Sequence, residues 1–413
     1  MIKNKLVFSS LFLFSATFVG NIFNAAYNFI MARFLGPANY GDLMALISIL
    51  YILTFPSTVL SNIVTKFSAI FIAHEDYKKL HYLSDFLTRK IIIFGLVVIV
   101  GFAIFTPFLA QNLKITHTWA LFLVSVLATL VFLVTLNFGL LTGVLKFKSL
   151  AAASIAWPVI RLAFSVGLIL LGFSVTGAIV GFVLATAITY ILTLYPMRFL
   201  NYFKEKHISL NWAQVGGYSL PASLSILGLT LLTNTDILLV KAFFSSDEAG
   251  AYSAVSLLAK IILFLSLPIV NMIFPVITQA YEAKRNFSRI FLIALGLITV
   301  LSGGTLGFFL LFPEFSISLL FGKSYLGASL YVGRMSIFIF VYALVYLFIT
   351  LWLSIGRLKF ALVSVVGALV QAILIYLYHS DLNQVIDISV YTCLGLLFLN
   401  VVYYLYSFRG KFR

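Results

Sequence analysis

The chain has 413 residues, of which 62% are hydrophobic and only 9% are charged, and its formal net charge is +15. Soluble domains carry roughly 25% charged residues, so this composition excludes a water-soluble globular protein and indicates one that is solvated by lipid. The single cysteine, Cys393, excludes an internal disulfide framework, and the five histidines show no metal-ligand spacing. The P-loop, HExxH and GxSxG signatures do not occur, so we expect a protein that is not an enzyme and needs no cofactor or metal.

Twelve stretches of the sequence are long and apolar enough to cross a bilayer as helices, which takes about 20 residues. They lie at 7–31, 43–72, 90–110, 118–143, 150–171, 174–197, 214–240, 250–279, 288–312, 327–354, 359–379 and 386–407. The first stretch continues to Met31 with no convincing cleavage site, so we interpret it as a retained helix and not as a signal peptide. The predicted fold class is an all-α polytopic membrane protein with twelve transmembrane helices.

The basic residues between these stretches are distributed unevenly. Nineteen lie at the helix ends that share a side with the two termini, whereas the opposite loops hold only Arg33, Lys114, Lys241 and Lys323. Cytoplasmic loops of membrane proteins carry such an excess of Lys and Arg. We therefore expect a multi-pass protein of the cell (cytoplasmic or inner) membrane with both termini in the cytoplasm. The positive charge then reflects topology and an affinity for anionic membrane lipid, and we expect no nucleic-acid partner.

Two pairs of landmarks indicate that a six-helix unit is duplicated. The turn ARFLGPANYGDL at 32–43 has a counterpart in KAFFSSDEAGAY at 241–252, and Gly41 and Gly250 are 209 residues apart. GVLKF at 143–147 matches GRLKF at 356–360, and their first residues are 213 apart. Because six is even, both halves begin on the same side of the membrane. This predicts two six-helix lobes related by a pseudo-two-fold axis along the membrane normal.

The predicted domain boundaries follow from this repeat. The N-terminal lobe covers residues 1–200 and the C-terminal lobe covers 213–413. The stretch between them, 201–212, is basic, aromatic and amphipathic, so we expect a cytoplasmic linker that lies in the membrane interface.

Four stretches resemble the polysaccharide-transporter branch of the multidrug/oligosaccharidyl-lipid/polysaccharide exporter superfamily, which includes the O-antigen-type lipid-linked oligosaccharide flippases. They are ARFLGPANYG (32–41), YSLPASLSILGLTLLTNTDILLV (218–240), EAGAYSAVSLLAK (248–260) and LLFGKSYLGAS (319–329). The resemblance implies two lobes around a central polar cavity that opens alternately to each face of the membrane. It also implies a polyprenyl-diphosphate-linked oligosaccharide as cargo. The chain lacks the two extra helices of the peptidoglycan-precursor relatives, which argues against their cargo.

The predicted function is an alternating-access flippase that moves such a glycolipid from the cytoplasmic to the outer leaflet for polysaccharide biosynthesis. Its expected partners are the lipid-linked oligosaccharide, membrane lipid, and the polysaccharide polymerase and glycosyltransferases that act on the same glycan. Two alternatives stay open. A cation-coupled multidrug exporter of the same fold would need a deeply placed acid, for which only Asp236 qualifies. A membrane enzyme or polymerase that acts on a glycolipid would need larger outer loops or clustered acids and histidines.

The first predicted helix carries a polar face. Thr17, Asn21, Asn24 and Asn28 fall within an arc of about 60° at 100° per residue. Polar residues inside membrane helices usually face a water-filled path, so we expect Asn21, Asn24 and Asn28 to line the substrate cavity. The alternative is a seam of hydrogen bonds between helices.

Four basic residues lie inside predicted helices and are further candidates for substrate binding: Lys66, Arg161, Lys260 and Arg334. Arg161 has no acid nearby in the sequence, and a planar guanidinium can bind two phosphate oxygens at once, so we predict that Arg161 contacts the diphosphate. In the alternative, it hydrogen-bonds backbone carbonyls beside Pro158. Lys66 lies near a helix end, where it can also snorkel to the interface.

Asp236 is an acid within the predicted helix 214–240. Its depth in the membrane differs from that of Lys260 by about 5 Å at 1.5 Å per residue. Asp236 is therefore predicted either to bind a cation or to form a structural ion pair with Lys260.

Overall fold

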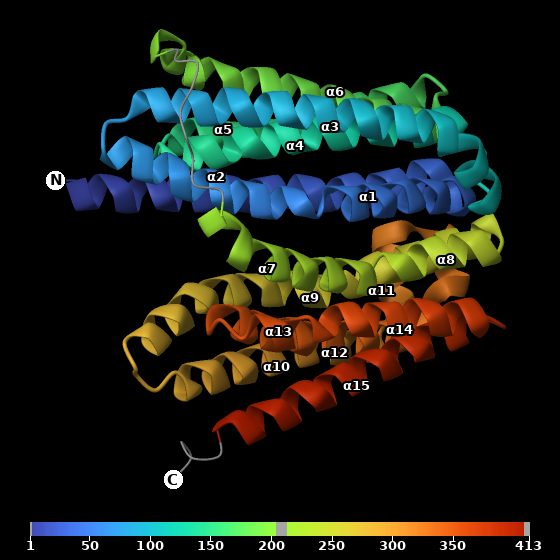
Figure 1. Cartoon of the computed structure of the whole chain (residues 1–413). Coiled ribbons are helices and arrows are strands. Elements are labelled where there is room, and N and C mark those ends of the chain that lie inside the picture. Colours follow the sequence, from blue (N-terminus) through green and yellow to red (C-terminus); the bar gives the residue numbers. More distant parts are fainter. Residues whose placement is uncertain (1, 204–212, 409–413) are drawn as a thin grey trace. The chain divides into compact units, whose positions relative to one another are not determined.

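The structure is a computed structural model that describes residues 2–203 and 213–408, and every element with regular secondary structure in these ranges is a helix (Figure 1). The chain divides into two compact units, Met1–Gly216 and Gly217–Arg413. Part of the expected linker, residues 204–212, lies outside the described residues. Of that stretch, the described residues 201–203 end a 3₁₀ helix, η1 (Tyr195–Phe203).

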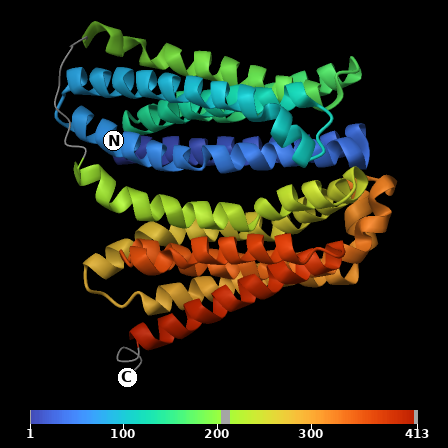
Figure 2. The same cartoon turned by 45° about the vertical axis from the view of Figure 1, so that its right-hand side comes forward.

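Unit 1 contains six α-helices, which precede η1. They are α1 (Ile2–Thr54), α2 (Pro56–Ala73), α3 (Tyr77–Asn112), α4 (Thr118–Gly143), α5 (Phe147–Leu170) and α6 (Ser174–Leu194). Within this unit α5 packs along α6 and α1, and α4 packs along α2 and α3 (Figures 1 and 2).

Unit 2 contains the remaining helices, the first of which begins just ahead of the unit boundary. They are α7 (Ala213–Leu232), α8 (Thr235–Phe243), α9 (Ser246–Glu282), α10 (Ser288–Leu311), α11 (Pro313–Phe321), η2 (Lys323–Ala328), α12 (Ser329–Ser354), α13 (Leu358–Ala361), α14 (Val363–Leu377) and α15 (Leu382–Phe408). The most buried helix is α12, which packs against α9 on one side and α15 on another.

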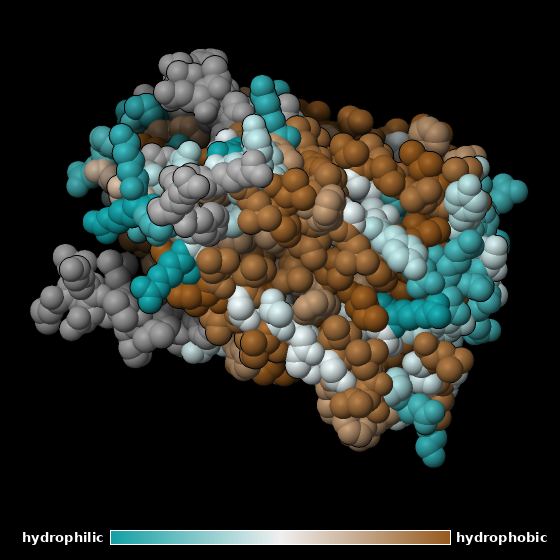
Figure 3. Space-filling view, turned by 90° about the horizontal axis from the view of Figure 1, so that it is seen from below, coloured by the Kyte–Doolittle hydropathy of each residue, from teal (hydrophilic) through white to brown (hydrophobic). Residues whose placement is uncertain are grey.

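Eleven helical segments in the described part of the chain are long and apolar enough to cross a membrane. They correspond to the predicted spans from 43–72 to 386–407, and the predicted span 7–31 lies within α1. The face seen in Figure 3 is apolar across its middle, and hydrophilic residues gather toward its two ends. This is the surface that a bilayer requires of a polytopic membrane protein.

The turn predicted at 33–42 is a bend at one residue. Gly36 alone leaves the helical region within α1, with φ 70° and ψ 173°, a conformation that favours glycine. The first helical part of α1 therefore ends at Gly36. The second helix begins at Pro37, where the missing N–H has no cost because the first N–H groups of a helix have no partner within it. The amide of Asn39 donates to the carbonyl of Leu35 across the bend (3.2 Å).

Two predicted continuous spans are interrupted. The span 43–72 breaks at Phe55, where Pro56 starts α2. The span 214–240 breaks at Thr233–Asn234, between α7 and α8. Proline explains the first break, since it cannot continue a hydrogen-bonded helix. The second break contains no proline and depends on contacts described below.

Corresponding turns recur in the two units, at offsets that agree with one sequence landmark and differ from the other. After α4 the residue with positive φ is Leu145 (59°), and after α12 it is Gly356 (73°), which is 211 residues later. In both turns the next backbone N–H, of Lys146 or Arg357, donates to the carbonyl five residues earlier, as in a Schellman motif. The GVLKF–GRLKF alignment at 213 is thus two residues out of step with the structure. A second pair, Glu75 and Lys284, recurs at 209.

Candidate functional site

Unit 1 holds a pocket of about 280 Å³ between α1, α4, α5 and α6. Its lining is a mixture of hydroxyl, amide and apolar groups: Thr17, Gly20, Asn21, Asn24, Val131, Val134, Thr135, Phe138, Ser154, Trp157 and Thr186. The indole N–H of Trp157 donates to the Thr186 hydroxyl (3.2 Å), which fixes both side chains at the wall. The lining carries no charge, so it suits a polar ligand whose groups both donate and accept hydrogen bonds.

The polar face of α1 meets this pocket over part of its length. Thr17, Asn21 and Asn24 line it, as the cavity interpretation expects. Asn28 instead donates from its amide nitrogen to the carbonyl of Asn24 (2.9 Å), within the same helix.

Arg161 lies on α5 beside the pocket and is only 4% exposed. Its Nη1 donates to Oδ1 of Asn24 (3.2 Å), and its guanidinium lies over the rings of Tyr27 (3.5 Å to the centre) and Phe182 (4.1 Å). Cation–π contacts of this kind stabilise a charge that has left water. Among the described residues, the partners of Arg161 are therefore aromatic rings and an amide, and neither an acid nor the Pro158 carbonyl. Contact with a diphosphate stays a prediction.

The break in unit 2 releases backbone carbonyls that a continuous helix would use for its own i+4 N–H groups. Three side chains from three other helices satisfy them. The hydroxyl of Tyr342 donates to Leu229 (2.8 Å), the amide of Gln371 to Leu232 (3.1 Å), and the ammonium of Lys260 to Thr233 (2.9 Å). Irregular backbone at membrane depth persists only where such partners exist. These three hydrogen bonds therefore stabilise the break in unit 2.

Asp236 lies in the first turn of α8, directly after the break, and is 0% exposed. Its Oδ2 accepts a hydrogen bond from the Tyr252 hydroxyl (2.7 Å), and its Oδ1 has no hydrogen-bond partner in the described part of the chain. Lys260 is close enough for its charge to act on Asp236, but the described residues include no direct ion pair between them. Lys260 instead holds the broken helix, and the cation interpretation of Asp236 stays a prediction.

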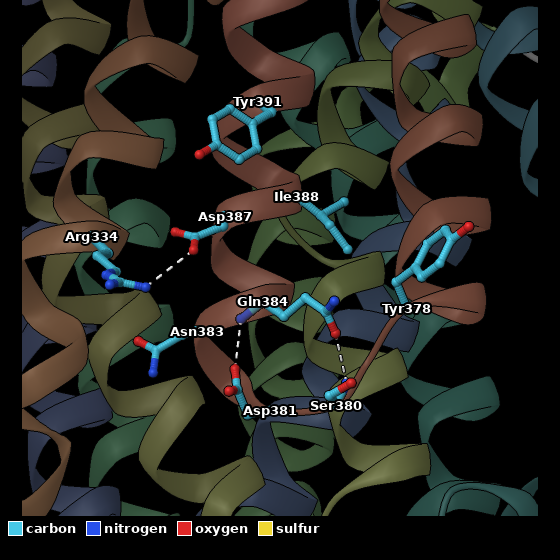
Figure 4. Close-up of a pocket in the computed structure, with 9 residues that line it drawn as sticks. All are labelled: Arg334, Tyr378, Ser380, Asp381, Asn383, Gln384, Asp387, Ile388 and Tyr391. Carbon is cyan, nitrogen blue, oxygen red and sulfur yellow. Dashed lines mark hydrogen bonds and ion pairs between the residues drawn. The ribbon is translucent and has the colours of Figure 1, made fainter.

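The other two basic candidates lie at exposed positions. Lys66 is exposed on α2. Arg334, on α12, donates from Nη1 to Oδ2 of Asp387 on α15 (3.1 Å), and both residues line a second pocket of about 640 Å³ in unit 2 (Figure 4). Sequence reasoning missed this pocket, although two tyrosines and two aspartates fall within 378–391 and could have indicated it.

The sequence matches a known family over most of its length. Residues 30–330 match the family described as polysaccharide biosynthesis protein. No curated protein matches the chain.

Three solved structures share the fold and are distant in sequence. A multidrug resistance MATE family transporter of the MOP superfamily, in an inward-facing conformation, is 13% identical (TM-score 0.77; 95% of this chain and 97% of that chain covered). The lipid II flippase MurJ, in an inward closed conformation, is 15% identical (TM-score 0.71; 98% and 88%). A MOP superfamily transporter from Pyrococcus furiosus is also 15% identical (TM-score 0.62; 95% and 95%).

At these identities the structural likeness establishes the fold, and the sequence match over residues 30–330 establishes the family. The chain belongs to the polysaccharide biosynthesis protein family.

Proposed function

We propose that the protein is an alternating-access flippase that moves a polyprenyl-diphosphate-linked oligosaccharide from the cytoplasmic to the outer leaflet of the cell membrane. The observation that carries the proposal is the family match over residues 30–330. The fold adds support, because the lipid II flippase MurJ shares it over 98% of this chain. In this proposal the protein moves its substrate without making or breaking covalent bonds.

The unit 1 pocket supports a substrate with many hydroxyl groups. Asn21 and Asn24 offer amide groups that both donate and accept, and the pocket wall is otherwise hydroxyl or apolar. Arg161 contributes a positive charge next to these amides. We assign Asn21, Asn24 and Arg161 to substrate binding, with the sugar at the amides and the diphosphate attracted by Arg161.

The remaining candidates have smaller roles in the proposal. Asn28 donates a hydrogen bond to the backbone carbonyl of Asn24, and Lys260 donates one to the Thr233 carbonyl at the helix break. Lys66 stays a candidate for attracting the anionic head group, since it is exposed. Arg334 is already paired with Asp387, so its charge is largely neutralised and it suits a sugar better than a phosphate.

Export of a surface glycan in cells tests this proposal. Cells that lack their own flippase for a lipid-linked oligosaccharide would receive the wild-type protein, Arg161→Lys or Arg161→Ala, at matched membrane levels. We expect export with the wild type, partial export with the lysine, which keeps the charge but loses the planar fork, and little with the alanine. Full export by Arg161→Ala would refute the assignment of Arg161 to substrate binding. No export by the wild type would count against the flippase function.

A cation-coupled multidrug exporter of the same fold is the second candidate. The observation that favours it is Asp236, a buried acid with one oxygen that has no hydrogen-bond partner in the described residues. A proton or a metal cation at that oxygen could couple an ion gradient to transport in either candidate. Efflux of ethidium from whole cells separates them, because only the exporter lowers ethidium accumulation and only the flippase restores the glycan.

A further inference from the structure

The second pocket, in unit 2, has a lining unlike that of a phosphate site. It measures about 640 Å³, within the roughly 300–1,000 Å³ typical of small-molecule sites. Its walls are Arg334, Tyr378, Ser380, Asp381, Asn383, Gln384, Asp387, Ile388 and Tyr391 (Figure 4). One arginine and two aspartates leave the lining with a net charge of −1. A phosphate would be repelled, whereas a neutral or amino-bearing ligand would not.

Local contacts hold this lining in place. Asp381 caps α15, since its Oδ1 accepts from the backbone N–H of Gln384 (2.8 Å), and Oε1 of Gln384 accepts from the backbone N–H of Ser380 (2.7 Å). Next to the pocket, the ring of His379 stacks on Phe243 with 3.8 Å between centres. The loop between α14 and α15 is therefore shaped before any ligand arrives.

The groups left for a ligand are of three kinds. Among the hydrogen bonds of the described residues, Gln384 uses its Oε1 and its backbone N–H, and the Asn383 amide is not used, so the Asn383 amide and the Gln384 amide nitrogen can bind hydroxyl groups. Tyr378 and Tyr391 are 56% and 70% exposed, which leaves their ring faces open to an apolar surface. The carboxylates of Asp381 and Asp387 accept from hydroxyls or from an ammonium.

Sugars are the ligands that need all three kinds of group at once. A pyranose ring has a face of C–H groups that packs on an aromatic ring and a rim of hydroxyls that each donate and accept. We infer that this pocket binds neutral or amino sugar residues, and that on the proposed function it receives the glycan part of the transported lipid. The positive-inside distribution places the α14–α15 loop on the outer side, where the glycan would emerge.

The test uses the full-length protein in lipid nanodiscs and four probes: maltotriose, a glucosamine trimer, trigalacturonate and inorganic pyrophosphate. Binding is measured by ligand-observed NMR, with thermal unfolding as a check on folding. We expect maltotriose or the glucosamine trimer to bind, and Asn383→Ala and Tyr391→Ala to weaken that binding about tenfold, as the loss of oriented contacts in a small-molecule site would. Tyr406→Ala is the matched control, because Tyr406 is an exposed tyrosine of α15 outside the pocket, and it should bind as the wild type does.

Three results would overturn the inference: no binding of the neutral or amino sugars, binding that survives both pocket variants, or pyrophosphate binding that Arg334→Ala abolishes. The proposed function fails separately. If the protein binds maltotriose but exports no glycan, the sugar-binding pocket stands and the flippase function is refuted. If export is normal but no sugar binds, only the sugar-binding pocket is refuted.

Discussion

The guanidinium of Arg161 lies 3.5 Å from the centre of the Tyr27 ring, and the hydroxyl of that tyrosine has no hydrogen-bond partner among the described residues. The ring is therefore the part of Tyr27 that matters to unit 1. The ring compensates the charge of Arg161, which is 4% exposed. Inserting an arginine at the middle of a bilayer costs roughly 2.5–3.5 kcal/mol on insertion scales.

Substitutions of Tyr27 should separate the ring from the hydroxyl. Tyr27→Phe keeps the cation–π contact and removes a buried unpaired hydroxyl, so we expect it to leave the thermal unfolding midpoint unchanged or slightly higher. Tyr27→Leu removes the contact and should destabilise unit 1 by about 1–2 kcal/mol, because a desolvated cation–π pair is worth that much. Equal midpoints for the two variants in the same detergent would show that the ring does not hold Arg161.

The helix break in unit 2 should depend on the hydroxyl of Tyr342. Tyr342→Phe leaves the carbonyl of Leu229 buried without its donor, a loss of about 1–3 kcal/mol. Tyr346→Phe, one turn later on α12, is the control, since the Tyr346 hydroxyl makes no hydrogen bond to another described residue. Hydrogen exchange at residues 229–234 should rise in Tyr342→Phe and stay unchanged in Tyr346→Phe. Protection that is identical in both would mean that the break does not need this bond.

Gly228 lets α7 approach α14 closely. A Cβ at this position would lie 2.4 Å from the backbone nitrogen of Val365, so Gly228→Ala must push the helices apart, and overpacking of this kind costs about 1–3 kcal/mol. Gly304→Ala on α10 is the matched control, because nothing lies within 4 Å of its Cβ position. Alanine is the better helix former there and should stabilise α10 by about 0.4–1 kcal/mol. We expect the thermal unfolding midpoint to fall in Gly228→Ala and to stay the same or rise in Gly304→Ala. The reverse order would refute the close packing of α7 and α14.

The two ends of α3 should lie on opposite sides of the membrane. Nineteen against four basic residues predict that the α2–α3 turn lies in the cytoplasm and the α3–α4 turn outside. In a Cys393→Ser background, Lys114→Cys should react with an impermeant maleimide added to intact cells. Glu75→Cys should react only after the cells are opened. Labelling of Glu75→Cys from outside would reverse the proposed orientation of both termini.

The apolar spans and the turn around Gly36–Pro37 could be read from the sequence, because a bilayer demands long apolar helices and Gly and Pro mark turns. The break at Phe55–Pro56 falls inside the predicted span 43–72 and was not predicted. The polar face of α1 was also predictable, since helical spacing alone places Asn21 and Asn24 together. The contact between Asn24 and Arg161 was not, because it joins two helices 137 residues apart. Arg161 has no acidic partner in the described part of the chain, and the sequence does not reveal that aromatic rings replace one.

Other features could not be predicted because their causes are not local. The break at Thr233–Asn234 contains neither glycine nor proline, and it persists through donors from α9, α12 and α14. The GVLKF–GRLKF match gives a register two residues too long, because Leu145 occupies the left-handed position that Gly356 fills in the other turn. The unit 2 pocket brings Arg334 together with residues from Tyr378 to Tyr391. No local sequence pattern predicts that residues so far apart in the chain share a pocket.

Movement of a lipid-linked oligosaccharide across a bilayer by the purified protein is the most direct test. Proteoliposomes would contain a polyprenyl-diphosphate-linked oligosaccharide with a fluorophore on the sugar, and dithionite added outside would quench only the fluorophores in the outer leaflet. We expect the protein to expose nearly all of the label to quenching over time, while protein-free vesicles keep the inner-leaflet share protected. A trapped soluble dye shows that the vesicles stay sealed. A protected fraction equal to that of protein-free vesicles, with the protein folded and both orientations present, would contradict the flippase function.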